Sequence, residues 1–305
     1  MERLFSRLLR QLPQEGGKEA KFADDLSVHK TYAADVPNDK VLEDLHLCQE
    51  SVHQWGQQNR VVFDASKEEF AVLHHVHGEG CDFRLLGPVF DAKLQMHSAV
   101  QKVLGKARPK LYALLKTRRF YNTADLVLQY KTHLLCVLEA CTPAVYHAAT
   151  SVLEPLDNLQ GSFLRQLGLT PEEAFLLHNL APLTLRRDVA MLGLLHKCNL
   201  GVAHDQLRAL FPPAPLQPRP VHHTRSAGKR HSRQLLERCT GNFLETTRRS
   251  AFGLVRVYNL LPQEVVDCAS VRTFQTALTS LAREACKTGR DNWETLLSPR
   301  KVLQG

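Results

Sequence analysis

The sequence predicts an α+β protein, with short antiparallel strands and one helix up to residue 93 and helices in the remainder. Two observations support this fold class. Runs of β-prone residues bounded by turn residues occur before residue 93 and not after it, and long stretches with apolar residues at helical spacing follow. A chain of 305 residues with 44% hydrophobic composition can bury a sizeable core. We therefore expect a globular protein of one large or two ordinary domains.

The first elements follow from local patterns. Residues 3–12 have leucines at helical spacing and precede a proline, which predicts a short amphipathic helix. Residues 20–29 predict two strands around a turn, because apolar residues flank an acidic pair. Residues 38–56 predict a helix that is capped by Asn38 and has one buried face. That face consists of Val41, Leu45, Cys48, Val52 and Trp55.

Three further β-prone runs predict strands. They are residues 61–63, 70–73 and 83–90, the last of them broken by Gly87-Pro88. After Lys93 such runs disappear. We place a domain boundary there, so that residues 1–93 form the first domain.

Beyond this boundary, amphipathic stretches predict four helices, at residues 96–118, 123–149, 151–167 and 182–199. Pro109 and Pro143 are expected to kink or split two of them. Residues 94–210 thus form the second predicted region. Five prolines between residues 211 and 220 predict a stiff linker, which continues as basic sequence to residue 230. Residues 231–305 predict a basic, mainly helical tail with a helix or two within 265–287.

Several functional classes are excluded by composition and motifs. The eight cysteines contain no C-x-x-C pair, which is typical of reduced, intracellular thiols. No apolar stretch approaches the roughly 18 residues of a membrane-spanning helix. We expect a nuclear or cytoplasmic protein, neither secreted nor membrane-bound; residues 1–10 as an organelle-targeting helix are the alternative. Dinucleotide-binding, P-loop and hydrolase motifs are absent. The group His74, His75, His77 and Cys81 favours a polar hairpin end over a zinc site, because no second ligand pair follows at finger spacing.

The tetrapeptide Phe22-Ala23-Asp24-Asp25 places two adjacent carboxylates at the turn of the first predicted strand pair. Carboxylates so close repel each other unless a cation lies between them. Their hard oxygen atoms suit Mg²⁺, with Mn²⁺ as the alternative ion. The pair therefore predicts a metal site of the kind used in two-metal phosphoryl transfer. Taken alone, it also fits a solvated turn.

The sequence Lys21-Phe22-Ala23-Asp24-Asp25 resembles the aromatic-x-Asp-Asp motif of reverse transcriptases, in the form common in non-LTR retrotransposons. Other segments resemble parts of the same family in the family's order: a helix (38–56), a lysine-bearing loop before an apolar strand (59–73), a Leu-Gly primer-gripping hairpin (83–87), a thumb helix (127–146), the segment after it (182–201), and an aromatic-Asn-x-Leu-Pro-x-x-Val pattern (258–265). Pro88 stands where an apolar residue is usual, and Tyr258 where Trp is usual. The resemblance covers residues 20–280 and implies a partial polymerase palm, a mostly helical thumb and a C-terminal tail.

The resemblance implies an RNA-directed DNA polymerase, a nucleotidyltransferase that uses an RNA template and a DNA primer. It assigns metal binding and catalysis to Asp24 and Asp25. It assigns to Lys67 the donation of a proton to the leaving pyrophosphate, although a lysine in a polar turn is also typical of a solvated side chain. Primer contact is assigned to Phe83, Leu86 and Gly87.

A basic segment of one sign lies between residues 102 and 119, where no Asp or Glu occurs. Interleaved apolar residues can face the core, so that the positive side chains project together and can follow a phosphate backbone. A solvated helix face, the alternative, normally mixes both signs. The predicted nucleic-acid-binding residues are Lys102, Lys106, Arg108, Lys110, Lys116, Arg118 and Arg119. A second basic stretch, residues 219–256, predicts either non-specific nucleic-acid binding or an import signal.

Two features of the family are missing from the 23 residues before Asp24: an earlier metal-binding carboxylate and a Gln-Gly segment that checks the template. We therefore expect an RNA-directed DNA polymerase by descent, incomplete as an isolated chain and lacking an N-terminal polymerase segment. The alternative, which we favour for the isolated chain, is a non-catalytic nucleic-acid-binding remnant of a retrotransposon polyprotein. A helical interaction protein with a coincidental Asp-Asp turn is the third interpretation.

Overall fold

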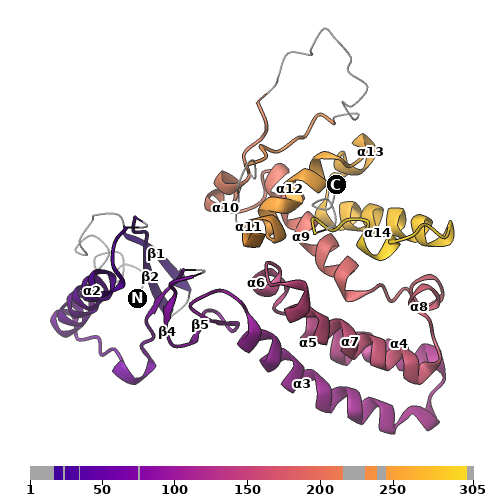
Figure 1. Cartoon of the computed structure of the whole chain (residues 1–305), viewed down its shortest axis with the longest axis horizontal. Coiled ribbons are helices and arrows are strands. Elements are labelled where there is room, and N and C mark those ends of the chain that lie inside the picture. Colours follow the sequence, from indigo (N-terminus) through magenta and orange to yellow (C-terminus); the bar gives the residue numbers. More distant parts are fainter. Residues whose placement is uncertain are drawn as a thin grey trace. The chain divides into compact units, whose positions relative to one another are not determined.

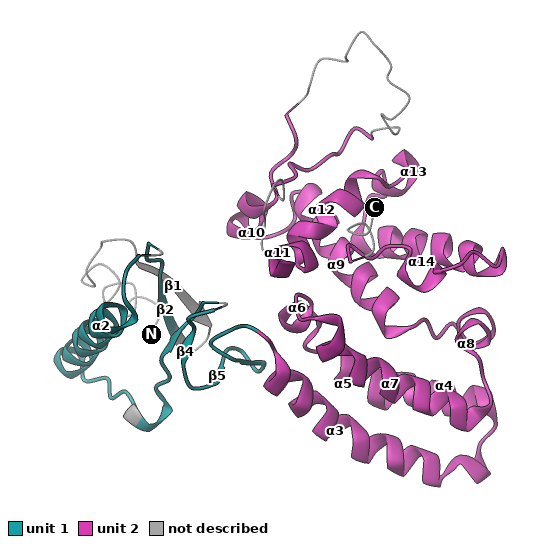
Figure 2. Cartoon of the chain, in the orientation of Figure 1, with its two compact units in different colours: residues 1–94 teal, residues 95–305 magenta. Residues whose placement is uncertain are grey.

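A computed structural model describes residues 17–22, 25–33, 35–74, 76–215, 231–238 and 245–300, with the backbone alone at residues 17–22, 25, 26 and 65. The chain divides into two compact units, Met1–Leu94 and Gln95–Gly305 (Figure 2). The domain boundary predicted from the sequence is at residue 93. The predicted helix at residues 3–12 lies outside the described residues. The fold is α+β: mostly helical, with a few short antiparallel strands.

The first described element of unit 1 is a β-hairpin (Figure 1). Strand β1 (Gly17–Phe22) pairs antiparallel with β2 (Asp25–Lys30), and the register sets Phe22 opposite Asp25. Two residues separate the strands, which is the commonest length of a hairpin connection. The two predicted strands around a turn are therefore confirmed.

Helix α2 (Asn38–Asn59) follows and buries Val41 and Trp55, as the apolar spacing predicts. The expected cap is wrong. Pro37 occupies the N-cap position in an extended conformation, so Asn38 is already helical and its side chain is free for other bonds. The Asn38 amide donates instead to the carbonyl of His77 and to the carboxylate of Glu79. The Asn38 side chain therefore joins the start of α2 to the later hairpin that contains His77 and Glu79.

The predicted strand at residues 61–63 is also wrong. Arg60 ends α2 in a left-handed conformation (φ 57°), and the amide of Val61 donates to the carbonyl of Gly56. This is the pattern of a Schellman helix end. The run therefore starts by closing the helix, and Val62 is 95% exposed. β-Prone residues form a strand only where a partner strand lies alongside.

The rest of unit 1 consists of short elements. A 3₁₀ turn and two hairpins follow α2: η1 (Ala65–Lys67), β3 (Ala71–Val72) with β4 (Glu79–Gly80), and β5 (Phe83–Arg84) with β6 (Val89–Phe90). Strands are thus confirmed within both remaining β-prone runs, although each is only two residues long. The turn between β3 and β4 carries His74, whose Nδ1 accepts from the amides of Val76 and His77. The structure thus has a polar hairpin end at the position for which the sequence predicts one.

Unit 2 is helical in its described residues apart from one isolated β-bridge. Its first part contains α3 (His97–Lys116), η2 (Arg118–Phe120), α4 (Thr123–Tyr130), the π-helical η3 (Lys131–Leu135), α5 (Cys136–Glu139), α6 (Thr142–Val145), α7 (Thr150–Leu167), α8 (Pro171–His178) and α9 (Leu183–Asn199). All four predicted helical stretches are found. Pro143 lies in the first turn of α6 and splits one of them. Helix α3 continues through Pro109, because the carbonyl of Gly105 that loses its amide partner is on an exposed face and can be hydrated.

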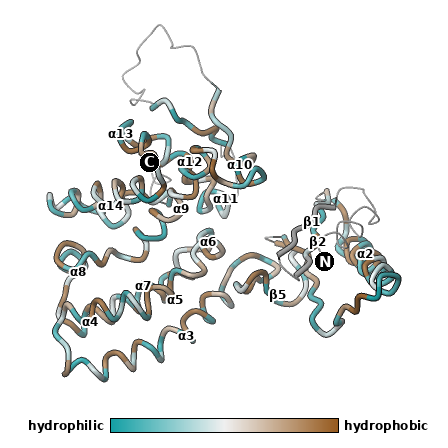
Figure 3. The backbone as a smooth tube through the Cα atoms, turned by 180° about the vertical axis from the view of Figure 1, so that it is seen from behind, coloured by the Kyte–Doolittle hydropathy of each residue, from teal (hydrophilic) through white to brown (hydrophobic). Residues whose placement is uncertain are grey.

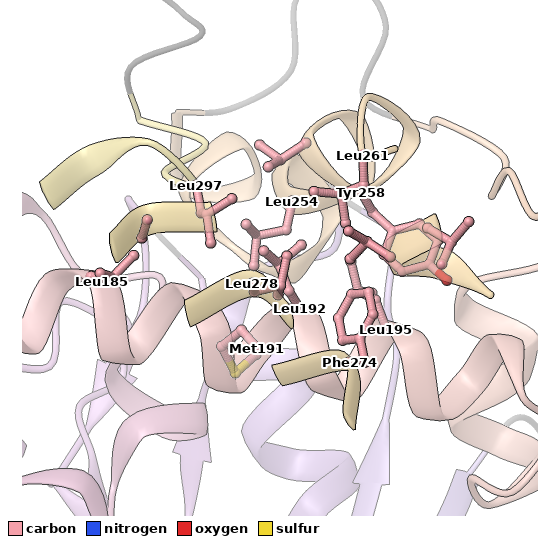
Figure 4. Packing of buried hydrophobic residues seen from close by; sticks show 14 of the residues in the cluster. Leu185, Met191, Leu192, Leu195, Leu254, Tyr258, Leu261, Phe274, Leu278 and Leu297 are labelled. Atoms are coloured by element: carbon pink, nitrogen blue, oxygen red, sulfur yellow. The ribbon is translucent and has the colours of Figure 1, made fainter. Parts of the chain in front are cut away.

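The second part of unit 2 shares a core with the first. It contains α10 (Asp205–Leu210), α11 (Glu245–Arg249), α12 (Ala251–Asn259), α13 (Gln263–Val266), α14 (Val271–Lys287) and η4 (Trp293–Thr295). Helices α12 and α14 pack on α9 (Figure 4). The apolar side chains that meet there include Leu192, Leu195, Leu254, Tyr258, Phe274 and Leu278.

The sequence predicts a linker and a separate tail after residue 210, whereas the described part of that stretch packs into this core. Phe211 is buried and its ring lies 5.1 Å from that of Phe252. Pro213 forms a β-bridge with Leu235, held by the backbone bonds on either side of it. Proline is tolerated at such an edge position because its missing amide faces away from the partner. Residues 216–230 lie outside the described part.

Along the helices, hydrophilic residues interrupt the hydrophobic ones at short intervals (Figure 3). Among the described residues, no helix combines the length and the apolar character needed to cross a bilayer.

Candidate nucleic-acid interface

The acidic pair is only partly within the described residues. Asp25 begins β2, and its backbone pairs with that of Phe22; Asp24 lies outside the described part of the chain. Within the described residues, no group of three His, Cys, Asp or Glu side chains is placed to hold a metal ion. Binding of Mg²⁺ or Mn²⁺ by Asp24 and Asp25 stays a prediction.

Lys67 ends the 3₁₀ turn η1, with a side chain that is 82% exposed. Its Nζ lies 3.5 Å from a carboxylate oxygen of Asp64. Asp64 also accepts from the hydroxyl and amide of Ser66, and these bonds lower the pKa of its carboxyl group. This environment is typical of a solvated polar turn. The proton-donating role of Lys67 stays a prediction.

The tip of the β5–β6 hairpin exposes an apolar side chain on a strained backbone. Leu86 (φ 49°) and Gly87 (φ 109°) both have positive φ, as a tight two-residue turn requires. Leu86 is 58% exposed, and a left-handed non-glycine residue costs roughly 1–2 kcal/mol. The amide of Leu85 donates to the carbonyl of Pro88 at 3.0 Å, while Pro88 has no amide to return the bond. The turn therefore forms despite Pro88, with one of its two cross-strand bonds.

Beneath this tip, the rings of Phe83 and Phe90 stack with centroids 5.6 Å apart. The carboxylate of Glu69 accepts from the amide of Arg84 at 2.7 Å and holds β5 from its outer side. Phe83 is thus part of the support for the turn, and the exposed predicted contact residues are Leu86 and Gly87. Single exposed apolar residues are common on protein surfaces, so the contact of Leu86 with a primer stays a prediction.

The basic segment forms α3 and η2, and all seven predicted basic side chains are exposed. The interleaved residues Val103, Leu104 and Leu111 are buried, and α3 packs with this face on α5 and α7. Lys102, Lys106 and Lys110 lie four residues apart, which aligns them in one stripe with about 6 Å of rise between neighbours. We call the exposed side of residues 102–119, which carries the seven basic residues, the α3 basic face.

The α3 basic face is not neutralised. No Asp or Glu occurs between Asp91 and Asp125. In the described part of the chain, none of the seven basic residues belongs to a salt bridge. Arg118 donates to the side-chain oxygen of Gln166 at 2.6 Å, which connects η2 to the end of α7 without loss of positive charge. A surface of this kind attracts polyanions and concentrates them locally.

Three exposed aromatic residues that the sequence prediction did not include lie in the same segment, within or next to α3 and η2. Tyr112, Phe120 and Tyr121 are 64%, 69% and 45% exposed. The Nζ of Lys116 lies 4.5 Å from the ring centroid of Tyr112, and the guanidinium of Arg119 lies 4.7 Å from that of Phe120. In the sequence they alternate with basic residues in 112–121, but this pattern does not distinguish exposed rings from buried ones.

The second basic stretch, residues 219–256, is used in part for structure. Arg249 donates to the carbonyl of His147 and to the carboxylate of Glu245, and its side chain is only 17% exposed. Arg233 lies 3.7 Å from Asp267. The basic residues of this stretch from Arg219 to Arg230 lie outside the described part of the chain. The described arginines thus give less free charge than the α3 basic face.

The two C-terminal stretches that carry the family resemblance are in contact. His196 of α9 is fully buried; its Nδ1 lies 3.0 Å from the hydroxyl of Tyr258, and its Nε2 lies 2.9 Å from the carbonyl of Cys268. The His196 ring stacks on Phe274 at 4.0 Å. Burial lowers the pKa of the His196 imidazole. These residues hold α9, α12 and α14 together and form no exposed site.

The same pattern also fixes a loop. The side chain of Asn259 accepts from the amide of Leu235 and donates to its carbonyl, both at 2.9 Å. Pro262 then occupies the N-cap of α13, whose Val265 is buried. Comparison with protein-family models, with curated proteins and with solved structures found no match for this chain.

Proposed function

We propose that this chain binds nucleic acid through the α3 basic face and descends from the reverse transcriptases of non-LTR retrotransposons. The observation that carries the proposal is the unneutralised charge of the α3 basic face: seven exposed basic side chains above a buried apolar face, and no acidic residue from 92 to 124. Phosphates that contact such a surface release their condensed counterions, which supplies a large part of the binding free energy at moderate salt.

The order of elements supports the proposed ancestry. A hairpin with an acidic pair comes first, a long helix follows, then a hairpin with Leu-Gly at its turn, and then helices with a basic face. In the proposed polymerase, unit 1 corresponds to part of a palm and α3 to α9 correspond to a thumb. Asp24 and Asp25 would hold Mg²⁺ or Mn²⁺, and Leu86 at the strained turn would contact the DNA primer.

A second function, nucleic-acid binding without catalysis, is favoured by one observation. The α3 basic face is built entirely from residues of unit 2, and its helix is anchored by α5 and α7. It therefore needs neither the acidic pair nor the hairpins of unit 1. Under this proposal, nucleic-acid binding does not require polymerase activity.

Binding is tested by titrating the chain with a fluorescent 20-nucleotide RNA at several salt concentrations. A variant with Lys102→Gln, Lys106→Gln and Lys110→Gln loses three charges of one stripe. We expect weaker binding, and a slope of log K against log salt that is smaller by about 2 to 3, since each phosphate contact contributes about 0.7 to 0.9. The matched control changes Lys197, Arg272 and Arg290 to Gln, which removes equal charge from exposed positions elsewhere in unit 2.

Two outcomes oppose the proposal. Binding that does not weaken with salt excludes a phosphate-tracking face, and equal losses in the two triple variants exclude this location. Polymerisation is tested separately, by primer extension on poly(A)–oligo(dT) with Mg²⁺ or Mn²⁺. Extension that Asp24→Asn abolishes supports the polymerase; no extension with retained salt-sensitive binding supports the non-catalytic function. A helical interaction protein would show neither.

A further inference from the structure

The C-terminal end of α3 combines exposed aromatic rings with free positive charge. Tyr112, Phe120 and Tyr121 are each at least 45% exposed, and residues 116 to 121 contain only basic and aromatic side chains apart from Thr117. We call Tyr112, Lys116, Arg119, Phe120 and Tyr121 the aromatic–basic surface. Aromatic residues and Arg are enriched at binding interfaces, so three exposed rings between residues 112 and 121 of a basic segment mark a candidate binding surface.

The cations are placed against these rings. Lys116 lies over Tyr112 and Arg119 lies over Phe120, at 4.5 and 4.7 Å from the ring centroids. At exposed sites such contacts contribute only about 0.5–1 kcal/mol, so they orient the side chains more than they stabilise the fold. Tyr112 and Phe120 are therefore each paired with a positive charge on one ring face, and this charge can meet a phosphate while the other face meets a base.

We propose that the aromatic–basic surface binds unpaired bases of single-stranded nucleic acid by stacking. This inference rests on the proposed function and deepens it, because phosphate contacts alone do not distinguish single strands from duplexes. In a duplex, the faces of the bases are covered by their neighbours and are not open to a side-chain ring. Stacking of bases on Phe and Tyr within a basic groove is the usual way in which proteins hold single strands.

The spacing of the rings fits more than one base. From Tyr112 to Phe120 the chain rises no more than about 13 Å, from the rise per residue of α and 3₁₀ helices. At 3.4 Å per nucleotide of a stacked strand, this span corresponds to about four nucleotides. An acidic peptide would satisfy the charges of this surface, but it would leave the rings without partners.

Fluorescence provides a direct test. The two native tryptophans, Trp55 and Trp293, are 3% and 6% exposed and supply a constant background. In a Phe120→Trp variant, stacked bases should quench the added tryptophan. The full chain is titrated with oligo(U)₂₀, with a blunt duplex and with an abasic strand of the same length and charge. We expect quenching by oligo(U)₂₀ only. Equal quenching by all three, or quenching by none while oligo(U)₂₀ binds, overturns the proposal.

Affinity gives an independent readout. Tyr112→Ala with Phe120→Ala should weaken binding of oligo(U)₂₀ by about 5- to 150-fold for each ring that stacks on a base. The same variant should bind the abasic strand as the unmodified chain does. Leu177→Ala with Leu260→Ala is the control, because these side chains are 73% and 65% exposed and lie in other elements. Circular dichroism verifies that each variant is folded.

The outcomes separate this inference from the proposed function. If salt-sensitive binding is retained but base and abasic strands bind equally, stacking is excluded and phosphate binding stands. If no nucleic acid binds, both fail. If polyglutamate competes as well as oligo(U)₂₀ at equal charge, the surface recognises polyanions in general, and the assignment to unpaired bases is overturned.

Discussion

His196 and Tyr258 are 62 positions apart in the sequence and share a hydrogen bond of 3.0 Å in the core of unit 2. The Nε2 of His196 lies 2.9 Å from the carbonyl of Cys268, an acceptor only, so Nε2 carries the proton and Nδ1 accepts from the Tyr258 hydroxyl. Both ring nitrogens are thereby satisfied in the neutral imidazole. The stretch around His196 and the C-terminal Tyr-Asn-x-Leu-Pro pattern are thus one packing unit.

Removal of the Tyr258 hydroxyl should leave Nδ1 of His196 buried without a partner. We expect Tyr258→Phe to lower the free energy of unfolding by about 1–3 kcal/mol. Tyr130→Phe is the matched control: Tyr130 is equally buried, but its hydroxyl bond to Gln160 is 3.4 Å long and should contribute less. Urea denaturation measures both variants. Equal losses at the two positions would contradict the role given to the His196–Tyr258 bond.

Stability should fall between about pH 4 and pH 7 because of one buried carboxyl group. Burial raises the pKa of Asp188 to about 7, although Tyr146 donates to its Oδ1 at 2.5 Å. Its Oδ2 has no hydrogen-bond partner within the described residues. The folded state therefore holds a proton that the unfolded state releases at its ordinary pKa, and the free energy of unfolding decreases as pH rises through this window.

Asp188→Asn tests this carboxyl group, because an amide does not titrate. The difference in unfolding free energy between the variant and the unmodified chain should grow in the variant's favour from pH 4 to pH 7. A pKa shift of about three units corresponds to a change in this difference on the order of 4 kcal/mol. His196 has the opposite sign: its lowered pKa removes stability as pH falls below 6.5. A pH profile that is the same with and without Asp188 would refute the assignment.

The β5–β6 turn should be more stable with a residue that tolerates a left-handed backbone. Leu86→Asn relieves part of the strain at φ 49°, and we expect a gain of about 0.5–1 kcal/mol in unfolding free energy. Leu85→Asn, at a neighbouring position without positive φ, is the control and should give no gain. If Leu86 contacts primer, the stabilised variant should also lose primer extension or duplex affinity. A gain in stability with unchanged binding would leave Leu86 without a functional role.

The long helices α3, α7, α9 and α14 are predictable from sequence because their buried residues recur at helical spacing, as Val103, Leu104 and Leu111 do in α3. The short helices α8, α10, α11 and α12 were not predicted. The first hairpin is predictable for a similar reason, since apolar runs flank a polar turn. The predictions from local pattern are wrong at Asn38 and at residues 61–63. There, a proline at the N-cap and a Schellman helix end determine the backbone conformation. Neither depends on hydrophobic periodicity.

The candidate site was predictable in its charge and not in its aromatic residues. Lys102 to Arg119 can be assigned to an exposed face, because a one-signed segment has no way to pair within itself. Tyr112 and Phe120 have no such signal, since aromatic residues at helical spacing are more often part of a core. Only the packing of α3 on α7 shows that these rings are exposed. The use of Arg249 as a structural donor to a distant carbonyl is equally non-local.

The Asn of the C-terminal pattern should act on the loop that contains Leu235. The side chain of Asn259 accepts from the amide of Leu235 and donates to its carbonyl. It thus makes the two hydrogen bonds that a neighbouring strand would make. In Asn259→Asp, the acceptor remains while the donor becomes a carboxylate facing a carbonyl oxygen. We expect a loss of about 1–3 kcal/mol and faster hydrogen exchange across residues 231–238. Asn199→Asp, which loses one bond to the carbonyl of Arg233, is the control and should accelerate exchange less. Unchanged exchange in Asn259→Asp would show that packing of Leu235 alone holds the loop.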